Sequence, residues 1–160
     1  MKTPSPQPWV LILTAGTALV RRLECWFTPI FDLALRLYVA EVFFRSGWLK
    51  LSDWSGTLNL FDYVYQVPLL PPHLAAVLGT AAELGLPVLL AAGLAGRFAA
   101  AGLLATNLMA AISFPDLSDL GLHDHWLWGV LLLVTVFHGP GRLSLDAVLA
   151  RRWPKKPYAG

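Results

Sequence analysis

Cysteine and charged residues are both scarce in this sequence. The 160 residues include a single cysteine, Cys25, and only 14% of the chain is charged. One cysteine excludes an intramolecular disulfide and a CxxC thiol relay, so any redox chemistry must use a bound group or a partner. The 12 Lys and Arg residues exceed the 10 Asp and Glu residues by only +2, which is too weak a charge for a nucleic-acid binder.

Hydrophobic residues are abundant instead, at 56% of the chain, and the mean hydropathy is +0.58. Soluble domains carry about 25% charged residues, so this composition is typical of one small membrane domain. Aromatic residues make up 12% of the chain, which fits belts of Trp and Tyr at the boundary between lipid and water. We therefore expect membrane lipid to surround the protein.

Four segments approach the length of about 20 apolar residues that a helix needs to cross a bilayer. They are residues 31–51, 74–95, 98–114 and 122–139. The sequence therefore predicts an all-α fold, a four-helix transmembrane bundle within residues 31–150. Residues 1–30 would form a cytoplasmic or interfacial N-terminal segment, and residues 151–160 a basic cytoplasmic tail.

The two ends of the chain add shorter helices to this prediction. The apolar run of residues 9–20 is too short to cross a bilayer, so we expect an interfacial or re-entrant helix there, with a cleaved signal peptide as the alternative. Near the other end, Ser144 and Asp146 are suited to the cap and first turn of a short amphipathic helix on the cytoplasmic side.

The distribution of Lys and Arg predicts the orientation in the membrane. Basic residues precede the first segment, separate the second from the third, and follow the fourth. The other two connections contain aspartates but no Lys or Arg. By the positive-inside rule, we expect a multi-pass protein of the bacterial cytoplasmic (inner) membrane with both termini in the cytoplasm. The longer outer connection carries four aromatic residues, so we expect it to lie across the mouth of the bundle.

The first segment carries four charged residues at positions where lipid is expected, namely Arg36, Glu41, Arg45 and Lys50. Ionisable groups at bilayer depth cost about 2.5–3.5 kcal/mol each on insertion scales and mark functional sites. On a helical wheel, Arg36 and Lys50 share one face with Gly47, whereas Glu41 and Arg45 lie on the opposite face. The second pair either cancels its own charge for insertion or lines a cavity or subunit interface.

Other polar residues occur at similar depth in the later segments. Glu83 lies near the middle of the second segment, and Pro87 leaves the Glu83 carbonyl without a helical donor. The charges of Arg36, Glu41, Arg45 and Glu83 sum to zero, which predicts one compensated network. Asn107 either joins that network or holds two helices together.

Two histidines near the start of the fourth segment, His123 and His125, are weak candidates for metal ligands. Two imidazoles and the carboxylate of Asp124 suit a metal, but an i, i+2 spacing does not place both rings on one helix face. A structural or interfacial role for this cluster is the alternative.

Several pieces of this chain, in order, resemble the DoxX/DoxD-like family of small bacterial membrane proteins. They are "LRLYVAEVFFRSGWLKL", "AAELGLPVLLAAGLAGR", "HW" at 125–126 and "GPGRLSLDAVL". The stretch "PLLPPHLAAVLGTAAELGLPVLL" is most similar to the HvfX-like branch, whose members are associated with gene clusters for modified, copper-binding peptides. The resemblance implies a four-helix membrane subunit tied to redox work. It assigns Arg36, Lys50 and Glu83 to a shared bundle site, and leaves Glu41 with Arg45 as particular to this protein or its branch.

Three functions are compatible with these observations. The first hypothesis is a redox-associated subunit that binds a quinone or similar small ligand between its helices, with Arg36, Glu83 and Arg45 anchoring polar groups or relaying protons. Such a subunit would serve a quinone-linked oxidoreductase rather than act as an independent enzyme, alongside a partner protein or in a homo-oligomer. The alternatives are a non-enzymatic membrane anchor or assembly partner, and a small transporter for a metal or metal-binding peptide.

Overall fold

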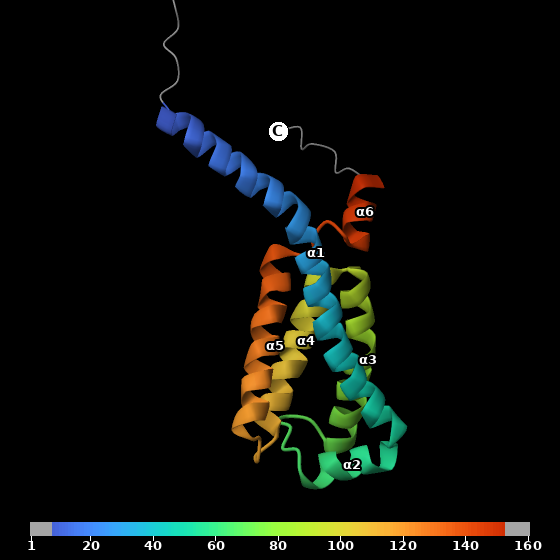
Figure 1. Ribbon diagram of the computed structural model, residues 1–160. Helices are drawn as coiled ribbons and strands as arrows, with labels where there is room; N and C mark the ends of the chain where they lie inside the picture. The colour runs from blue at the N-terminus through green and yellow to red at the C-terminus, as the bar shows by residue number, and fades with distance from the viewer. Residues whose placement is uncertain (1–7, 153–160) are drawn as a thin grey trace, which may run out of the picture.

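The computed structural model describes the backbone of residues 8–152 and the side chains of residues 16–152. Within that range the chain is entirely helical outside its turns (Figure 1). The helices are α1 (Pro8–Ser52), α2 (Trp54–Tyr63), α3 (Pro72–Ala92), α4 (Gly96–Ser113), α5 (Asp119–His138) and α6 (Leu145–Arg152). The predicted all-α fold class is confirmed.

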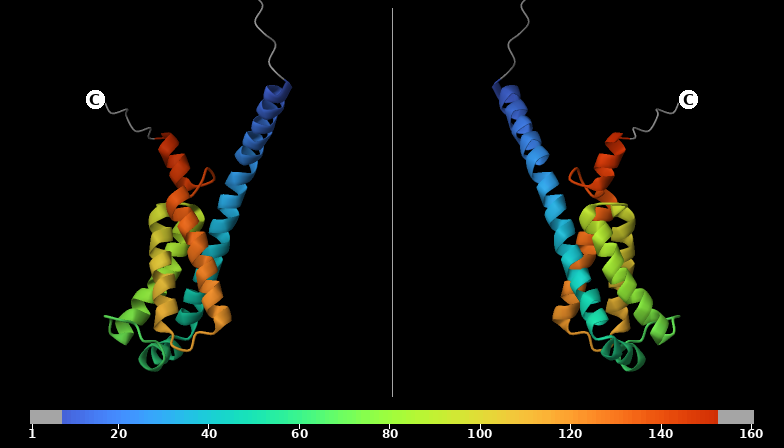
Figure 2. Two further views of the ribbon diagram at one scale, coloured as in Figure 1. Left: turned by 90° about the vertical axis from the view of Figure 1, so that its left-hand side faces the viewer. Right: turned by 90° about the vertical axis from the view of Figure 1, so that its right-hand side faces the viewer.

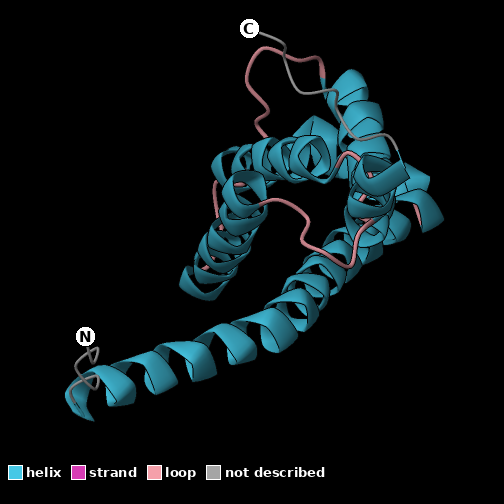
Figure 3. Cartoon of the chain, turned by 90° about the horizontal axis from the view of Figure 1, so that it is seen from above, coloured by secondary structure: helices cyan, strands magenta, loops and turns pink. Residues whose placement is uncertain are grey.

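Four helices run alongside one another and enclose the main core. The second half of α1 packs on α3, α3 on α4, α4 on α5, and α5 returns to α1 (Figures 1 and 3). Aliphatic and aromatic side chains of all four helices fill the centre of this bundle: Val39, Ala40, Phe43, Leu90, Ala99, Ala100, Leu103 and Leu132. Each of the four predicted segments therefore contributes one wall of the bundle.

The N-terminal part of α1 differs from the prediction. Residues 9–20 do not form a separate interfacial helix, because α1 continues without a break for 45 residues, or about 68 Å. Pro29 lies inside it and leaves the Cys25 carbonyl without a helical donor, and the guanidinium of Arg142 lies 3.5 Å from that oxygen. The first half of α1 projects beyond the bundle (Figure 2).

Proline and glycine residues set the limits of the other bundle helices. Pro71 and Pro72 begin α3, and Gly93 ends it in the left-handed conformation at φ 65°. For that reason α3 ends three residues before the predicted limit of residue 95. Gly139, at φ 96°, ends α5 next to the predicted limit of 139.

The long connection after α1 covers one end of the bundle. α2 lies across one end of the bundle, as expected from its aromatic residues, and its Phe61 packs on Ala75 and Ala76 of α3 (Figure 1). The side chain of Asp53 caps α2 by accepting the Gly56 amide at 2.9 Å. The aromatic content of the connection did not indicate that half of it would be helical.

The predicted short helix near the C-terminus is α6. Ser144 caps it, since its hydroxyl accepts the Ala147 amide at 3.2 Å. α6 lies at the end of the bundle opposite α2, where α1 also leaves the bundle (Figure 1).

Two of the helices, α3 and α5, are long and apolar enough to cross a membrane. α1 and α4 run beside them over the same length, although their composition does not meet the same test (Figure 1). The four crossings predicted from the sequence stay a prediction.

Candidate functional site

The charged residues of α1 separate into three places rather than forming one network. Arg36 and Lys50 share a face of the helix but lie 14 residues apart, which is about 21 Å along its axis. Arg36 therefore belongs to the α6 end of the bundle, and Lys50 to the α2 end. The prediction that Arg36, Glu41, Arg45 and Glu83 form one compensated network is wrong.

Arg36 closes the end of α3. Its side chain is 1% exposed, and Nη1 donates to the carbonyls of Leu90 and Ala91 at 3.1 and 2.9 Å. Nη2 donates to the Leu143 carbonyl, at the start of the α6 region. The last carbonyls of a helix lack partners and carry partial negative charge, so a buried guanidinium satisfies both their hydrogen bonding and their electrostatics.

The neighbouring turn between α3 and α4 depends on α6. Ala95 adopts a left-handed conformation at φ 48°, which is strained for a residue other than glycine. The Asp146 carboxylate accepts the amides of Ala95 and Gly96 at 2.9 Å each, and so replaces the side-chain cap that α4 lacks. These contacts make the α6 end a structural junction of the bundle.

At the α2 end, Lys50 and Glu83 form an ion pair inside the bundle. Lys50 Nζ lies 2.6 Å from Glu83 Oε2 and also donates to Ser46 Oγ at 2.8 Å, and the two charged side chains are 16% and 8% exposed. Gly47 permits this pairing, since a Cβ there would lie 2.9 Å from the Glu83 Cβ and force α1 away from α3. Of the residues that the resemblance assigned to a shared site, Lys50 and Glu83 are brought together.

The ion pair borders a cavity of about 260 Å³, here named the α2-end cavity. Residues of α1, α2, α3 and α4 and of the segment that follows α2 line it: Lys50, Phe61, Tyr65, Val67, Leu70, Ala75, Leu78, Gly79, Ala82, Glu83, Thr106, Met109, Ala110 and Ser113. The walls are mainly apolar, and four of the polar lining residues, Lys50, Glu83, Tyr65 and Ser113, come from different elements.

Two polar side chains of this cavity were not identified from the sequence. Ser113 Oγ is buried and has no hydrogen-bond partner among the residues described. Tyr65 packs between Phe61 and Phe114, with ring centroids 4.8 and 5.5 Å away. Burial and, second, the negative charge of Glu83 raise the pKa of Tyr65 above its ordinary value, so its phenol keeps its proton. The aromatic run after α2 signals Tyr65, but nothing in the sequence distinguishes Ser113.

Glu41 and Arg45 lie outside the bundle. Both side chains are exposed on the face of α1 that points away from the other helices. No ion pair within 4.0 Å joins them or links either one to another described residue. The predicted pairing along the helix is therefore not formed, and neither residue reaches Glu83.

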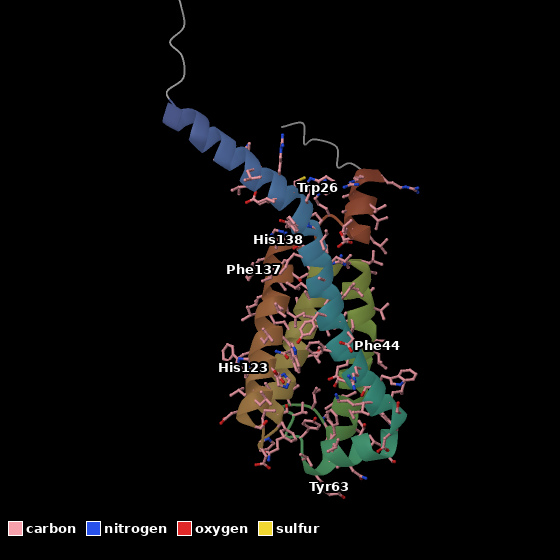
Figure 4. All side chains as sticks on the ribbon, in the orientation of Figure 1. Trp26, Phe44, Tyr63, His123, Phe137 and His138 are labelled. Carbon is pink, nitrogen blue, oxygen red and sulfur yellow. The ribbon has the colours of Figure 1, made fainter. Side chains whose placement is uncertain are left out.

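Asn107 and His125 hold α4 against α5. The Asn107 amide donates to the His125 carbonyl at 2.8 Å, and its oxygen lies 2.8 Å from His125 Nδ1. Of the two alternatives for Asn107, this contact corresponds to the one in which it holds two helices together. His123 is exposed on the outer side of α5 (Figure 4), and no group of three His, Cys, Asp or Glu residues in the described range is arranged to hold a metal ion.

Comparison with known proteins identifies the family. The family model for DoxX matches residues 31–116, which is more than half of the chain. An "Uncharacterized protein" of Haemophilus influenzae is 30% identical over 136 residues, covering 79% of this chain and 87% of that protein. No solved structure matches the chain. The chain is therefore a membrane protein that belongs to the DoxX family.

Proposed function

We propose that the protein is an integral subunit of the bacterial cytoplasmic membrane whose α1, α3, α4 and α5 each cross the bilayer. The bundle half of α1 and the other three helices each contain 18 to 22 residues, close to the roughly 20 that a bilayer requires. The Lys and Arg distribution favours a cytoplasmic α6 end and an outward α2 end.

We further propose that the α2-end cavity holds the ring of a quinone or a similar small molecule. The observation that carries this proposal is that Ser113, whose buried hydroxyl has no partner among the described residues, lines a mainly apolar cavity. A buried donor without an acceptor is costly, so it favours a ligand that supplies one. Quinone rings offer carbonyl oxygens on an apolar body, which suits this combination of apolar walls and few donors.

The size and opening of the cavity are compatible with such a ligand. Its volume of about 260 Å³ is just below the range of about 300–1,000 Å³ for small-molecule sites, so it suits one ring rather than a whole isoprenoid quinone. Leu78 of α3 and Met109 of α4 line the cavity and are also exposed on the bundle surface. An apolar tail can therefore leave between these helices into lipid.

The polar residues of the cavity have distinct roles in this proposal. A bound quinone would carry two electrons and two protons between a partner enzyme and the membrane pool. Tyr65, whose raised pKa keeps the phenol protonated, donates a hydrogen bond to one carbonyl. Lys50, held by Glu83, would supply the second donor.

The electrons must come from a partner protein in this proposal. Cys25 is the only cysteine, and it lies on α1 about 38 Å along the helix axis from the cavity residue Lys50. The resemblance to the HvfX-like branch favours a partner from the maturation of copper-binding peptides. Family members are small, so the subunit would anchor and serve that enzyme rather than act alone.

Quinone content of the purified protein tests this function. The protein is isolated in mild detergent from quinone-containing bacterial membranes, and extracted quinone is quantified per mole of protein. We expect about one quinone per chain, and about 2- to 10-fold less after Ser113→Ala or Tyr65→Phe, since each removes one net hydrogen bond of about 0.5–1.5 kcal/mol.

Matched controls exist outside the cavity. Tyr63 is exposed near the end of α2, and Ser52 bonds only its own helix, so Tyr63→Phe and Ser52→Ala should leave the quinone content unchanged. Absence of quinone from the wild-type protein, or equal losses in the control and cavity variants, would contradict the proposal.

A further inference from the structure

A stripe of exposed side chains runs along the bundle half of α1. Its members are spaced alternately by four and three residues: Ala34, Tyr38, Glu41, Arg45, Trp48 and Ser52. This period of 3.5 residues is the one by which two long helices pack along each other in a left-handed pair. Within the described chain, no other helix covers this stripe, which is named here the α1 seam.

The charges at the centre of the α1 seam lie at membrane depth, if α1 crosses the bilayer as proposed above. Gly47 packs against Glu83, which is halfway along α3, and Arg36 reaches Leu90 near the end of α3. Glu41 and Arg45 lie between Arg36 and Gly47 on α1. Both are therefore inside the length over which α3 can span the membrane.

Facing lipid is an unfavourable state for both side chains. Ionisable residues at this depth normally turn to a bundle interior, a water-filled cavity or an opposite charge. Glu41 and Arg45 instead point outward without an ion pair in the described part of the chain. The isolated subunit is thus incomplete along this face.

We propose that the α1 seam is the contact with a second copy of this chain, related by a two-fold axis along the membrane normal. Glu41 and Arg45 are one helical turn, about 6 Å, apart. A parallel copy places the partner's Arg45 opposite Glu41 on the diagonal, and the partner's Glu41 opposite Arg45. The four charges then form a neutral ring of two acids and two bases, in which each charge has an opposite charge one turn away on its own helix and another on the diagonal.

Self-complementarity is the reason for choosing a second copy over a different protein. An acid and a base one turn apart on the same face can each reach the opposite charge of an identical surface on the diagonal, and a two-fold axis makes each contact twice. A different protein would need its own matching charges at the same depth. The projecting half of α1 also exposes Trp26, Phe27 and Ile30, and Trp26 lies just beyond the bundle (Figure 4).

Disulfide cross-linking in native membranes tests where the copies meet. In a Cys25→Ser background, Trp48→Cys places a thiol on the α1 seam, and Val130→Cys places one on the exposed side of α5 as the matched control. A seam position repeats across the two-fold axis within disulfide range, so we expect a cross-linked dimer from Trp48→Cys and at least 10-fold less from Val130→Cys. Equal yields would overturn the proposed contact.

Charge exchange tests the ring itself. Glu41→Arg and Arg45→Glu each bring four like charges together, and we expect dimer dissociation constants, measured in detergent by native mass spectrometry, to rise at least 10-fold. The double variant restores two acids and two bases and should return to within about 3-fold of the wild-type value. Failure of the double variant to recover, or no effect of either single change, would contradict the proposal.

The dimer and the ligand proposal can fail separately. Quinone content is measured in the same preparations, and Glu41 and Arg45 do not line the α2-end cavity. A cross-linked dimer without quinone supports the α1 seam and contradicts the proposed ligand. Quinone without a seam cross-link supports the proposed ligand and contradicts the α1 seam as the dimer contact.

Discussion

Arg36 shows how a buried charge can serve the fold of a membrane protein without serving its chemistry. Its guanidinium bonds three backbone carbonyls at the junction of α3 and α6, where helix ends leave acceptors without donors. The planar group reaches several acceptors at once, which a lysine ammonium on a flexible stem does less well. Arg36 is therefore better explained as a structural cap than as a ligand for a substrate.

Replacing Arg36 by glutamine should strongly destabilise the bundle. The change leaves the carbonyls of Leu90 and Leu143 without their donor, and it removes the Arg36 charge that interacts with the buried Asp32, which also lies 3.6 Å from His138. Breaking a buried charge arrangement of this kind costs about 3–5 kcal/mol. Thermal unfolding in detergent, followed by circular dichroism, measures the loss. Arg22→Gln, on the exposed projecting helix, is the control, and equal melting temperatures for both variants would refute the assigned role.

The phenol of Tyr65 should lose its proton at a higher pH than that of an ordinary tyrosine. Burial and the Glu83 charge raise the pKa of its phenol above the usual value of about 10, so the unfolded chain loses this proton first. The resulting contribution to folding stability is complete below about pH 10 and is lost as the pH rises through the higher folded-state pKa. Phenolate absorbance, with Tyr65→Phe subtracted, measures the titration.

Glu83→Gln separates the two causes of that shift. Removing the carboxylate charge should lower the pKa of Tyr65 part of the way toward its ordinary value, because burial remains. Asp62→Asn, which changes an exposed aspartate of α2, should leave the titration unchanged. A Tyr65 that titrates like a free tyrosine in the wild-type protein would contradict the described surroundings.

Among the helices, α6 stabilises the turn between α3 and α4. Asp146 is the contact that makes this testable, since it accepts two amides of a turn far away in the sequence. Asp146→Asn keeps the shape but offers one acceptor oxygen and no charge. We expect the amides of Ala95 and Gly96 to exchange hydrogen about 10-fold faster or more, as charge-assisted hydrogen bonds contribute about 1.5–3 kcal/mol.

A matched carboxylate controls for the loss of charge alone. Asp119 lies exposed in the first turn of α5, so Asp119→Asn should not change exchange at the α3–α4 turn. If the Ala95 and Gly96 amides exchange at the same rate in Asp146→Asn and in the wild-type protein, α6 does not stabilise this turn.

The sequence predicts elements better than it predicts contacts between them. Apolar runs and the residues Pro72, Gly93 and Gly139 locate the bundle helices to within a few positions, because they act locally on the backbone. The unbroken α1 was not predicted, since a 12-residue apolar run contains no information about the helix that continues it. α2 was missed as a helix because its aromatic residues indicate burial rather than conformation.

The candidate site was predictable only in part for a related reason. The helical wheel separates Arg36 and Lys50 from Glu41 and Arg45, and the structure keeps that separation. Depth along the bundle decides which of these residues can meet, and it depends on the relative shift of α1 and α3 at Gly47. That shift is a property of helix packing, so charge balance alone grouped Arg36 with Glu83, although Glu83 pairs with Lys50, which lies about 21 Å along α1 from Arg36.

For the molecule as a whole, the two ends of the bundle have different tasks. The α6 end joins α1, α3, α4 and α6 through hydrogen bonds between the side chains of Arg36 and Asp146 and the backbone. The α2 end carries the ion pair, a tyrosine, an unpartnered serine and a cavity. This difference between the two ends leads to the central claim, which is that a quinone-like ring binds at the α2 end.

Photolabelling with an azido-quinone tests that claim most directly. The probe is bound to the full-length protein in bilayer nanodiscs and activated by light, and labelled residues are identified by peptide mass spectrometry with excess unlabelled quinone as competitor. We predict competed labels within residues 61–67 and 106–113, and their loss after Ser113→Ala with Tyr65→Phe. Labels spread evenly over the lipid-facing side of α5, and not displaced by the competitor, would contradict a quinone site in the α2-end cavity.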